Sequence, residues 1–214
     1  MVGVRGRCLL DLTSILLKGL LKKVVVSLRN STQAFQDKFK NLNLVFNPEF
    51  LTERNAVLDF ANQKRAIIGG QSSDVEKVAM LYRDRFGDTI NIVKTNFQTA
   101  EMIKYMNNLF LATKVSFLND MKILSDKLDI DWNMAIKGFS LDERVGNSHN
   151  DVPGHDGKFG FGGSCLPKDM QALINFADKH DINMTVLKGA WETNLKVRSD
   201  KDWEKLKGRA VTKK

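Results

Sequence analysis

A glycine-rich stretch that ends in a cysteine is the part of this sequence best suited to carry chemistry. Residues 159–169 read FGFGGSCLPKD, and the glycines remove side chains where a ligand can touch the backbone. Pro167 is typical of the first position of a helix, so Cys165 is expected just outside a helix N-terminus. Free N–H groups there, together with Lys168, favour a thiolate over a thiol. Cys165 is therefore a candidate nucleophile, and the alternative is an inert buried cysteine beside a helix cap.

An acidic side chain follows this cysteine at helical spacing. Asp169 lies four residues after Cys165 and returns to the same side of the predicted helix, where its carboxylate can hold a water molecule or the cysteine itself. The glycines before Cys165 do not form the dinucleotide-binding fingerprint GxGxxG, because their spacing is wrong and no strand leads into them. That fingerprint is absent from all 214 residues.

Two other pairs of polar residues have spacing that suits catalysis. Lys104 and Asn108 project from one face of the longest predicted helix, where an ammonium and an amide can both point at a developing oxyanion. Such a pair is more often an ordinary solvated face. Glu49 and Glu53 follow a predicted strand end, which is where open α/β sheets bind ligands. Their carboxylates can bind a ribose or activate water, or they can simply cap a helix.

Strands and helices alternate in the first part of the chain, and only helices follow. Short β-branched runs predict strands at residues 24–26, 44–46, 66–69 and 90–93. The helices predicted between these strands are residues 31–40 and 73–85. This order predicts βαβ units and a parallel sheet. Further helices are predicted, around an irregular stretch at 146–164, for residues 99–128, 131–138, 167–180 and 183–197.

The expected fold class is α/β followed by all-α. Residues 1–95 are expected to form an incomplete Rossmann-like domain, although residues 1–30 have no clear order of strand, turn and helix. Residues 96–197 are expected to form a helical dimerisation and catalytic domain. Residues 198–214 are expected to be a basic tail.

Composition excludes several classes of protein. Cys8 and Cys165 are far apart in the chain, which leaves neither a disulfide framework nor a metal-binding CxxC pattern, so we expect no metal site. Asp11 and Lys18 interrupt the apolar stretch at 9–21, so we expect no membrane span, no signal peptide and a cytoplasmic protein.

The net charge of +8 is unevenly distributed. The excess of lysine and arginine lies in residues 1–40 and 196–214, whereas the middle of the chain is slightly acidic. Aromatic residues are not interleaved with the basic runs, as a platform for stacking bases would require. We therefore expect solvated basic ends and no nucleic-acid partner, and salt-dependent binding to random DNA would favour the alternative.

Three segments together resemble the UDP-glucose/GDP-mannose dehydrogenase family. Members carry NPEFLxEG, AExxKxxxNxFLAxKxxxxNE and GFGGSCxPKD in this order, and close matches stand here at residues 47–53, 100–120 and 160–169. The resemblance covers residues 43–197. It implies a homodimer, NAD as cofactor and a nucleotide sugar such as UDP-glucose as substrate.

The resemblance also implies a role for each matching residue. Cys165 would be the nucleophile, Lys104 and Asn108 would stabilise oxyanions, Asp169 would position water and Glu49 would assist hydrolysis. The residues that would contact NAD are Glu53 and Lys168. Those that would line the sugar-nucleotide site are Phe50, Leu51, Arg144, Phe159, Gly160, Phe161 and Gly162. The arginine that matches Arg144 reaches across the dimer interface in the family, so it is expected to serve the neighbouring subunit.

The family reaction oxidises a primary alcohol to a carboxylate with two NAD molecules, as in the conversion of UDP-glucose to UDP-glucuronate. A cysteine thiolate traps the intermediate aldehyde as a thiohemiacetal, loss of a hydride gives a thioester, and water hydrolyses that thioester. Each of the implied residues has a distinct part in this sequence of steps.

Departures from the family pattern imply an incomplete enzyme. Arg54 stands where the family has a glycine, and residues 27–32 are shorter than and unlike the family's KSTVxxGT segment. The GxGxxG half and a C-terminal nucleotide-binding domain are not found in these 214 residues. The alternative is a catalytically silent dimerisation module that keeps only the helical core.

Overall fold

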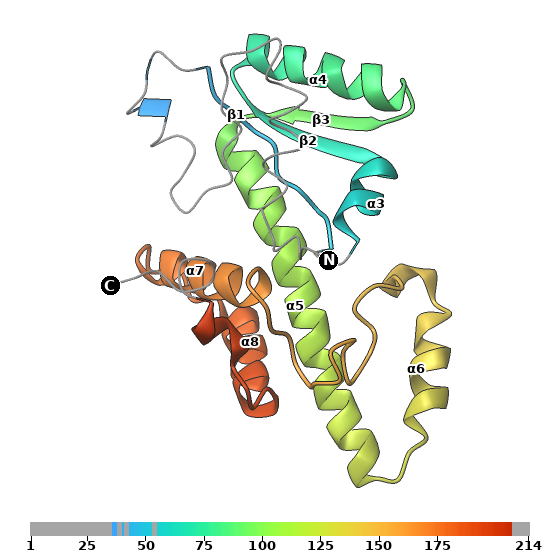
Figure 1. Cartoon of the computed structure of the whole chain (residues 1–214). Coiled ribbons are helices and arrows are strands. Elements are labelled where there is room, and N and C mark those ends of the chain that lie inside the picture. The colour runs from blue at the N-terminus through green and yellow to red at the C-terminus, as the bar shows by residue number, and fades with distance from the viewer. Residues whose placement is uncertain (1–35, 38–39, 41–42, 53–54, 207–214) are drawn as a thin grey trace, which may run out of the picture. The chain divides into compact units, whose positions relative to one another are not determined.

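The computed structural model describes residues 36–37, 40, 43–52 and 55–206 (Figure 1). The chain divides into two compact units, the first ending at Lys104 and the second beginning at Tyr105. The strand predicted at 24–26 lies outside the described residues, as does most of the helix predicted at 31–40.

A three-stranded sheet forms the centre of the first unit. Its strands, in the order β1-β2-β3, are Val45–Phe46, Arg65–Gly70 and Asn91–Thr95. β2 and β3 are parallel, with Ile67 opposite Val93, and the helix α4 (Ser72–Phe86) connects them. This βαβ unit confirms the order predicted from the alternating β-branched and amphipathic segments.

The pairing of β1 differs from the expected all-parallel sheet. β1 runs antiparallel to β2, with Val45 opposite Gly70. In a parallel unit a crossover helix carries the chain back along the sheet. Among the described residues between β1 and β2, the only helix is α3 (Ala56–Ala61), which has six residues and was not predicted from the sequence. β1 is therefore a short antiparallel edge on an otherwise parallel sheet, a common arrangement in α/β folds.

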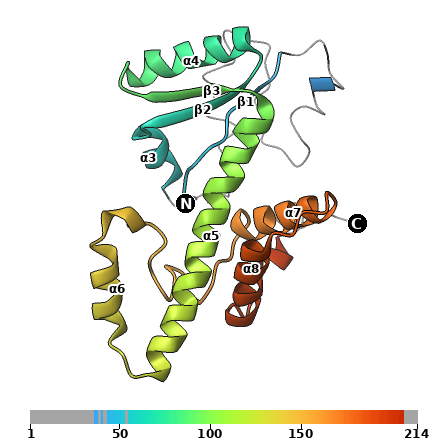
Figure 2. The same ribbon diagram turned by 180° about the vertical axis from the view of Figure 1, so that it is seen from behind.

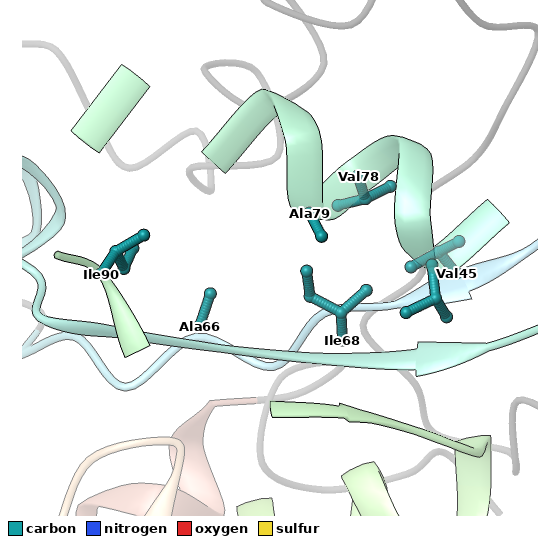
Figure 3. Packing of buried hydrophobic residues seen from close by; sticks show 7 residues of the cluster. Val45, Ala66, Ile68, Val78, Ala79 and Ile90 are labelled. Atoms are coloured by element: carbon teal, nitrogen blue, oxygen red, sulfur yellow. The ribbon is translucent and has the colours of Figure 1, made fainter. Parts of the chain in front are cut away.

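Alternating side chains of the strands fill two separate cores. Ala66 and Ile68 of β2 point toward α4 and pack with residues of that helix, as Figure 3 shows. Ile67 points to the opposite face and packs against Phe97 and Ala100 in the first turns of α5. Both faces of β2 are thus buried, as its nearly continuous apolar sequence predicts.

The second unit is helical, as predicted. Its α-helices are α6 (Trp132–Ser140), α7 (Leu166–Asp178), α8 (Thr185–Val197) and the part of α5 (Phe97–Lys127) that follows Lys104. Two short 3₁₀ helices that were not predicted are η1 (Glu143–Val145) and η2 (Asp202–Lys205). α6 begins where the Asp131 carboxylate accepts a hydrogen bond from the Met134 N–H at 3.1 Å.

The core of the second unit forms where α5, α7 and α8 meet. Figures 1 and 2 place α7 and α8 side by side on one side of α5, with α6 on the other side. Phe161 enters this core from the glycine-rich stretch and packs with Leu109 of α5, Met170 of α7 and Ala190 of α8. The stretch that leads to Cys165 is therefore attached to the core through one of its own side chains.

Candidate active site

Cys165 occupies the N-cap position of α7, immediately before the first helical residue. Pro167 is the second residue of the helix, one position later than expected. Proline suits this position because an N–H in the first turn has no partner within the helix, and proline has no N–H. The Cys165 side chain is exposed, and its Sγ lies 3.6 Å from Oγ of Ser164. Sequence reasoning gave Ser164 no role. An exposed thiol at a helix N-terminus can meet a substrate carbon.

Asp169 is buried one turn into α7 and is held by two neighbours. Its side chain is almost inaccessible, at 4% exposure. Nδ2 of Asn108 donates to Oδ2 at 2.6 Å, and Nζ of Lys168 lies 3.2 Å from Oδ1. The Asp169 N–H donates to the carbonyl of Cys165 at 3.0 Å. The structure thus brings together four of the predicted residues, all of them in the second unit.

Three side chains hold the backbone of the glycine-rich stretch. The two asparagines among them are buried, and none of the three was predicted as functional. Oδ1 of Asn119 on α5 accepts from the Gly160 N–H at 3.0 Å. Asn194 on α8 accepts from the Phe161 N–H at 2.7 Å and donates to the Phe161 carbonyl at 3.1 Å. Asn119 and Asn194 stand among apolar residues at helical spacing, which predicts that both side chains face the core. A buried polar side chain needs a hydrogen-bond partner, so this pattern could have identified both asparagines as structurally important.

The third of these side chains is a carboxylate beyond α8. Asp202 accepts from the Gly163 N–H with both oxygens, at 3.2 and 3.1 Å. Asp202 also pairs with Arg198, whose guanidinium is 2% exposed although it carries a charge. These residues lie in the region expected to be a basic tail. Among the described residues of this region, 198–206, Arg198 and Trp203 are buried.

Two glycines of the stretch are required by neighbouring side chains of the protein, whereas the sequence suggested space for a ligand. A Cβ on Gly160 would collide with Oδ1 of Asn194, and a Cβ on Gly162 would collide with Nη2 of Arg198 and lie 2.5 Å from Oδ1 of Asp202. Both glycines therefore make room for the protein's own side chains. Gly163 differs from them, because nothing lies within 4 Å of its Cβ position.

Glu49 and Lys104 lie near each other in the first unit. Burial by the surrounding atoms raises the pKa of Glu49, although its side chain retains solvent exposure, and the positive charge of Lys104 acts in the opposite direction. Asn47, two residues earlier, donates to the Ile67 carbonyl at 2.7 Å and accepts from the Tyr82 hydroxyl at 2.5 Å. Burial raises the pKa of Tyr82 to about 12, so this hydroxyl remains a donor at neutral pH.

The remaining predicted residues are placed as follows. Phe50 is half-buried against the core of the first unit, with the Arg65 guanidinium 4.5 Å from its ring centroid, and Leu51 is half-buried beside it. Phe159 is half-buried. Arg144 lies in η1 with its side chain 88% exposed and is bound to the carboxylate of Asp142. Glu53 lies outside the described residues.

A shallow cavity of about 300 Å³ lies elsewhere in the second unit. It is formed by the first turns of α6 and by residues 150–155, and it includes none of the predicted site residues. In the described part of the chain, no three side chains of the types that bind metals gather around one point. No helix among the described residues is both long and apolar enough to span a bilayer.

The junction between β2 and α4 tests whether the described residues can hold the pyrophosphate of a dinucleotide. A Cβ on Gly69 would lie 2.6 Å from Cβ of Ala100, and one on Gly70 would lie 3.0 Å from the Leu44 carbonyl oxygen. These glycines pack against the protein itself and do not leave an open cradle. The described residues therefore do not fit a dinucleotide's pyrophosphate at this junction.

Comparison with known proteins extends the resemblance toward the N-terminus. The NAD-binding-domain model of the UDP-glucose/GDP-mannose dehydrogenase family matches residues 10–85, and the family's central-domain model matches residues 98–196. The resemblance seen in the motifs begins only at Asn43. The family match therefore includes residues 10–42, which lie before the part of the chain that the motif resemblance covers.

Individual relatives agree with this assignment. The UDP-glucose 6-dehydrogenase TuaD of Bacillus subtilis is 37% identical over 158 residues, which cover 74% of this chain and 33% of that protein. The UDP-glucose 6-dehydrogenase of Rickettsia felis is 36% identical over 170 residues, which cover 78% of this chain and 37% of that protein. The chain thus spans between a third and two fifths of the length of these relatives.

Solved structures agree at the level of the fold. A UDP-glucose dehydrogenase from Pyrobaculum islandicum is 31% identical and superposes with a TM-score of 0.62 over 72% of this chain and 34% of that one. A UDP-D-ManNAc dehydrogenase from Pyrococcus horikoshii has a TM-score of 0.64 at 23% identity, over 78% of this chain and 40% of that one, and shows the same fold. The chain belongs to the UDP-glucose/GDP-mannose dehydrogenase family of NAD-dependent oxidoreductases.

Proposed function

We propose that this chain supplies the thiol chemistry of an NAD-dependent oxidation of a nucleotide sugar, of the type that converts UDP-glucose to UDP-glucuronate. The observation that carries the proposal is the arrangement around α7. An exposed Cys165 at the N-cap lies one turn before a buried Asp169, which binds Asn108. This arrangement unites a nucleophile with groups that can stabilise charge and position water.

Cys165 acts as the nucleophile toward the aldehyde form of the sugar. Its sulfur adds to the carbonyl carbon and converts the carbonyl oxygen to an oxyanion, which gives a thiohemiacetal. After the hydride has left that carbon, the product is a thioester on Cys165. Water then adds to the thioester carbon, the carbon–sulfur bond breaks, and the carboxylate and the free thiol are released.

Asn108 and Lys104 stabilise the oxyanions formed in these steps. An amide nitrogen carries two hydrogens, so Asn108 can donate one to Asp169 and offer the other to an oxyanion. Lys104, one turn earlier on α5, offers an ammonium group. Loss of one such donor costs on the order of 3 kcal/mol in the free energy of the transition state.

Glu49 assists the hydrolytic step as a general base. Its pKa is raised by burial, and a carboxylate with a raised pKa accepts a proton from water more readily than an ordinary one. Asp169 is a positioning residue in this proposal, because its oxygens already bind Asn108 and Lys168.

NAD would accept the hydride, and Glu53 and Lys168 are the residues of this chain proposed to contact it. Neither residue supplies a pyrophosphate cradle, and the glycines at the β2–α4 junction are filled by the protein itself. The described residues therefore do not fix the position of the cofactor.

The sugar nucleotide is proposed to bind along the stretch from Phe159 to Gly162, with Phe50 and Leu51 as further lining residues. The open space at Gly163 supports an approach of the ligand near the end of that stretch. Arg144 is proposed to serve the neighbouring subunit of a homodimer. Its 88% exposure supports this, because its only described partner is Asp142, two residues before it in the same turn.

A catalytically silent dimerisation module remains the second candidate function. The observation behind it is a row of apolar side chains on an exposed side of α5. Such a row can form an interface without any catalytic activity. The exposed residues of this stripe in the second unit include Met106, Phe110, Phe117 and Met121. The two candidates differ in whether Cys165 takes part in turnover.

The decisive experiment follows NADH formation from UDP-glucose and NAD. The 214-residue chain alone is expected to give none above background, because a misplacement of the cofactor by about 1 Å can cost a hundredfold in rate. Addition of a separately expressed dinucleotide-binding chain from a family member is expected to restore turnover, and Cys165→Ser is expected to abolish it. Restored turnover that persists in Cys165→Ser would overturn the thiol mechanism, and no turnover in any combination would favour the silent module.

A further inference from the structure

We propose that Asp202 and Arg198 position Cys165 by holding the end of the glycine-rich stretch, a role that rests on the proposed function only in that Cys165 is the nucleophile. Residues 198–203, here called the 198–203 segment, follow α8 and lie in the region expected to be a basic tail. In the structure it binds the backbone two residues before Cys165, at Gly163.

The contact nearest to Cys165 is made by Asp202. Both of its carboxylate oxygens accept from the Gly163 N–H, which lies two residues before the cysteine. The other two N–H groups that side chains hold in this stretch belong to Gly160 and Phe161 and are bound by neutral asparagines. Of these three bonds, only the one at Gly163 depends on a charged side chain, and it is the one closest to the thiol.

Arg198 pairs with Asp202 and also with Asp156, which lies three residues before the glycine-rich stretch. Its Nη2 lies 3.1 Å from Asp202, its Nη1 lies 2.8 Å from Asp156, and its Nε donates to Asp200 at 2.8 Å. Lys158 also pairs with Asp200. The Arg198 side chain is 2% exposed and its charge is balanced by these three carboxylates.

Packing fixes the 198–203 segment on its other side. Trp203 is buried against Trp191 of α8, with 5.3 Å between the ring centroids. The absence of a side chain at Gly162 lets Arg198 and Asp202 approach the backbone. Asp202 is thus held from two directions, and it transmits that restraint to Gly163 and on to the N-cap position of α7.

Loss of the Asp202 bond frees the last residues before the helix. Cys165 then spends less time at the N-cap position of α7, beside the free N–H groups of the first helical turn. Its reactivity toward a small electrophile therefore reports on the 198–203 segment, and this readout requires neither NAD nor turnover.

The experiment measures the rate at which iodoacetamide alkylates Cys165 in the full chain carrying Cys8→Ser, with mass spectrometry as the readout. Asp202→Ala is expected to lower the rate at pH 7 by about threefold or more. Asp202→Asn keeps an oxygen acceptor for the Gly163 N–H and is expected to recover most of the parental rate. Asp178→Ala removes an ion pair with Lys188, 2.7 Å long, that joins α7 to α8 and is expected to leave the rate unchanged.

Arg198→Lys provides a second variant in case Asp202→Ala does not fold, as judged by circular dichroism. It retains the positive charge but loses the planar fork, and it is expected to lower the rate less than Asp202→Ala. The proposal is wrong if the folded Asp202→Ala or Arg198→Lys protein is alkylated at the parental rate. It is equally wrong if Asp178→Ala slows alkylation as much as they do. If the rates change as expected while complemented turnover does not depend on Cys165, the proposed function fails and the positioning role remains.

Discussion

Asn108 on α5 donates a hydrogen bond from its Nδ2 to Oδ2 of Asp169 on α7, with 2.6 Å between the two atoms. The residues are 61 positions apart in the sequence, and the carboxylate is buried. The backbone N–H of the same aspartate binds the carbonyl of Cys165. The long helix is therefore linked to the residue that carries the thiol through one side chain and one backbone bond.

Removal of the amide is expected to destabilise the second unit. In Asn108→Ala one oxygen of a buried carboxylate loses its partner, which costs about 1–3 kcal/mol in the free energy of unfolding. All three tryptophans lie in this unit, so their fluorescence during urea unfolding measures the loss. Asn133→Ala, at an exposed position on α6, is the control and is expected to change stability by less than about 0.5 kcal/mol. Equal midpoints for the two variants would contradict the coupling.

Gly162 is expected to reject any larger side chain. Gly162→Ala places a methyl group against the guanidinium of Arg198 and the carboxylate of Asp202, and the strain is expected to cost about 1–3 kcal/mol. Gly189→Ala is the matched control, because nothing lies within 4 Å of its Cβ position in α8 and alanine favours a helix by up to about 1 kcal/mol. Thermal unfolding should move the two melting temperatures in opposite directions. A neutral Gly162→Ala would mean that the 198–203 segment can shift away.

Periodicity was sufficient to predict the longer helices and the parallel pair of strands in the described part of the chain. The helices predicted at residues 73–85 and 99–128 correspond to α4 (Ser72–Phe86) and α5 (Phe97–Lys127). Long segments with apolar residues at helical spacing are the segments whose structure local patterns predict best. The parallel pairing of β2 with β3 followed in the same way from the helix between them.

Contacts between distant residues could not be predicted from local patterns. The antiparallel direction of β1 depends on the path of the chain between Phe46 and Arg65. The spacing of apolar residues does not predict that path. The need for glycine at 162 depends on Arg198 and Asp202, which come after it across two intervening helices. The glycines before Cys165 suggested space for a ligand, whereas the structure fills two of those spaces with its own side chains.

The ion pairs around Arg198 predict a response to acid. The hydrogen bond from Lys158, with further help from Arg198, holds the pKa of Asp200 below the ordinary aspartate value. Burial acts to raise the pKa of Asp156, but Arg198, the Lys158 N–H and the charge of His155 together outweigh it, and the net shift is also downward. Depressed pKa values of acids stabilise the fold above the ordinary aspartate pKa of about 3.9, and this contribution is lost as the pH falls through the lower folded values.

Arg198→Met is therefore expected to move the acid transition to higher pH. Without the guanidinium, the folded pKa values of Asp156 and Asp200 rise toward the ordinary value, and their stabilisation is lost sooner on acidification. Tryptophan fluorescence is suited to this measurement because Trp203 is buried and lies three residues after Asp200 in the chain. Asn108→Ala controls for a general loss of stability in the same unit. If the acid transition of Arg198→Met has a midpoint pH no higher than that of Asn108→Ala, Arg198 does not lower the pKa values of Asp156 and Asp200.

The exposed stripe on α5 predicts self-association. Phe110 is 66% exposed and lies in line with Met106, Phe117 and Met121, whereas Leu109 and Ala112 of the same helix face the core. Such a second apolar side suits an interface related by two-fold symmetry. Light scattering at tens of micromolar is expected to give the mass of a dimer, and Phe110→Glu to give that of a monomer. Phe176→Glu, at an exposed position on α7, should leave the dimer intact, and a monomeric parental chain would exclude the interface.

Two lysines of the first unit are expected to act on two different glutamates. The charge of Lys104 lowers the pKa of Glu49 against the raising effect of burial, so Lys104→Met is expected to raise that pKa further. Lys94 lies 2.5 Å from Glu76 and its hydrogen bond is the main cause of the lowered pKa of that residue, so Lys94→Met is expected to raise the pKa of Glu76. Each variant is thus the control for the other.

Carbon-detected NMR of the glutamate carboxyl groups measures both titrations in one sample, with Glu49→Gln and Glu76→Gln to assign the signals. Lys104→Met should move only the Glu49 curve to higher pH, and Lys94→Met only the Glu76 curve. If Lys104→Met left Glu49 unchanged, its raised pKa would be set by burial alone, and Lys104 would have no electrostatic link to the proposed base. If the expected shift occurs, the protonation of Glu49 depends on the same ammonium group that is proposed to stabilise the oxyanion. The acid limb of complemented turnover should then rise in pH in Lys104→Met, in the same direction as the NMR titration.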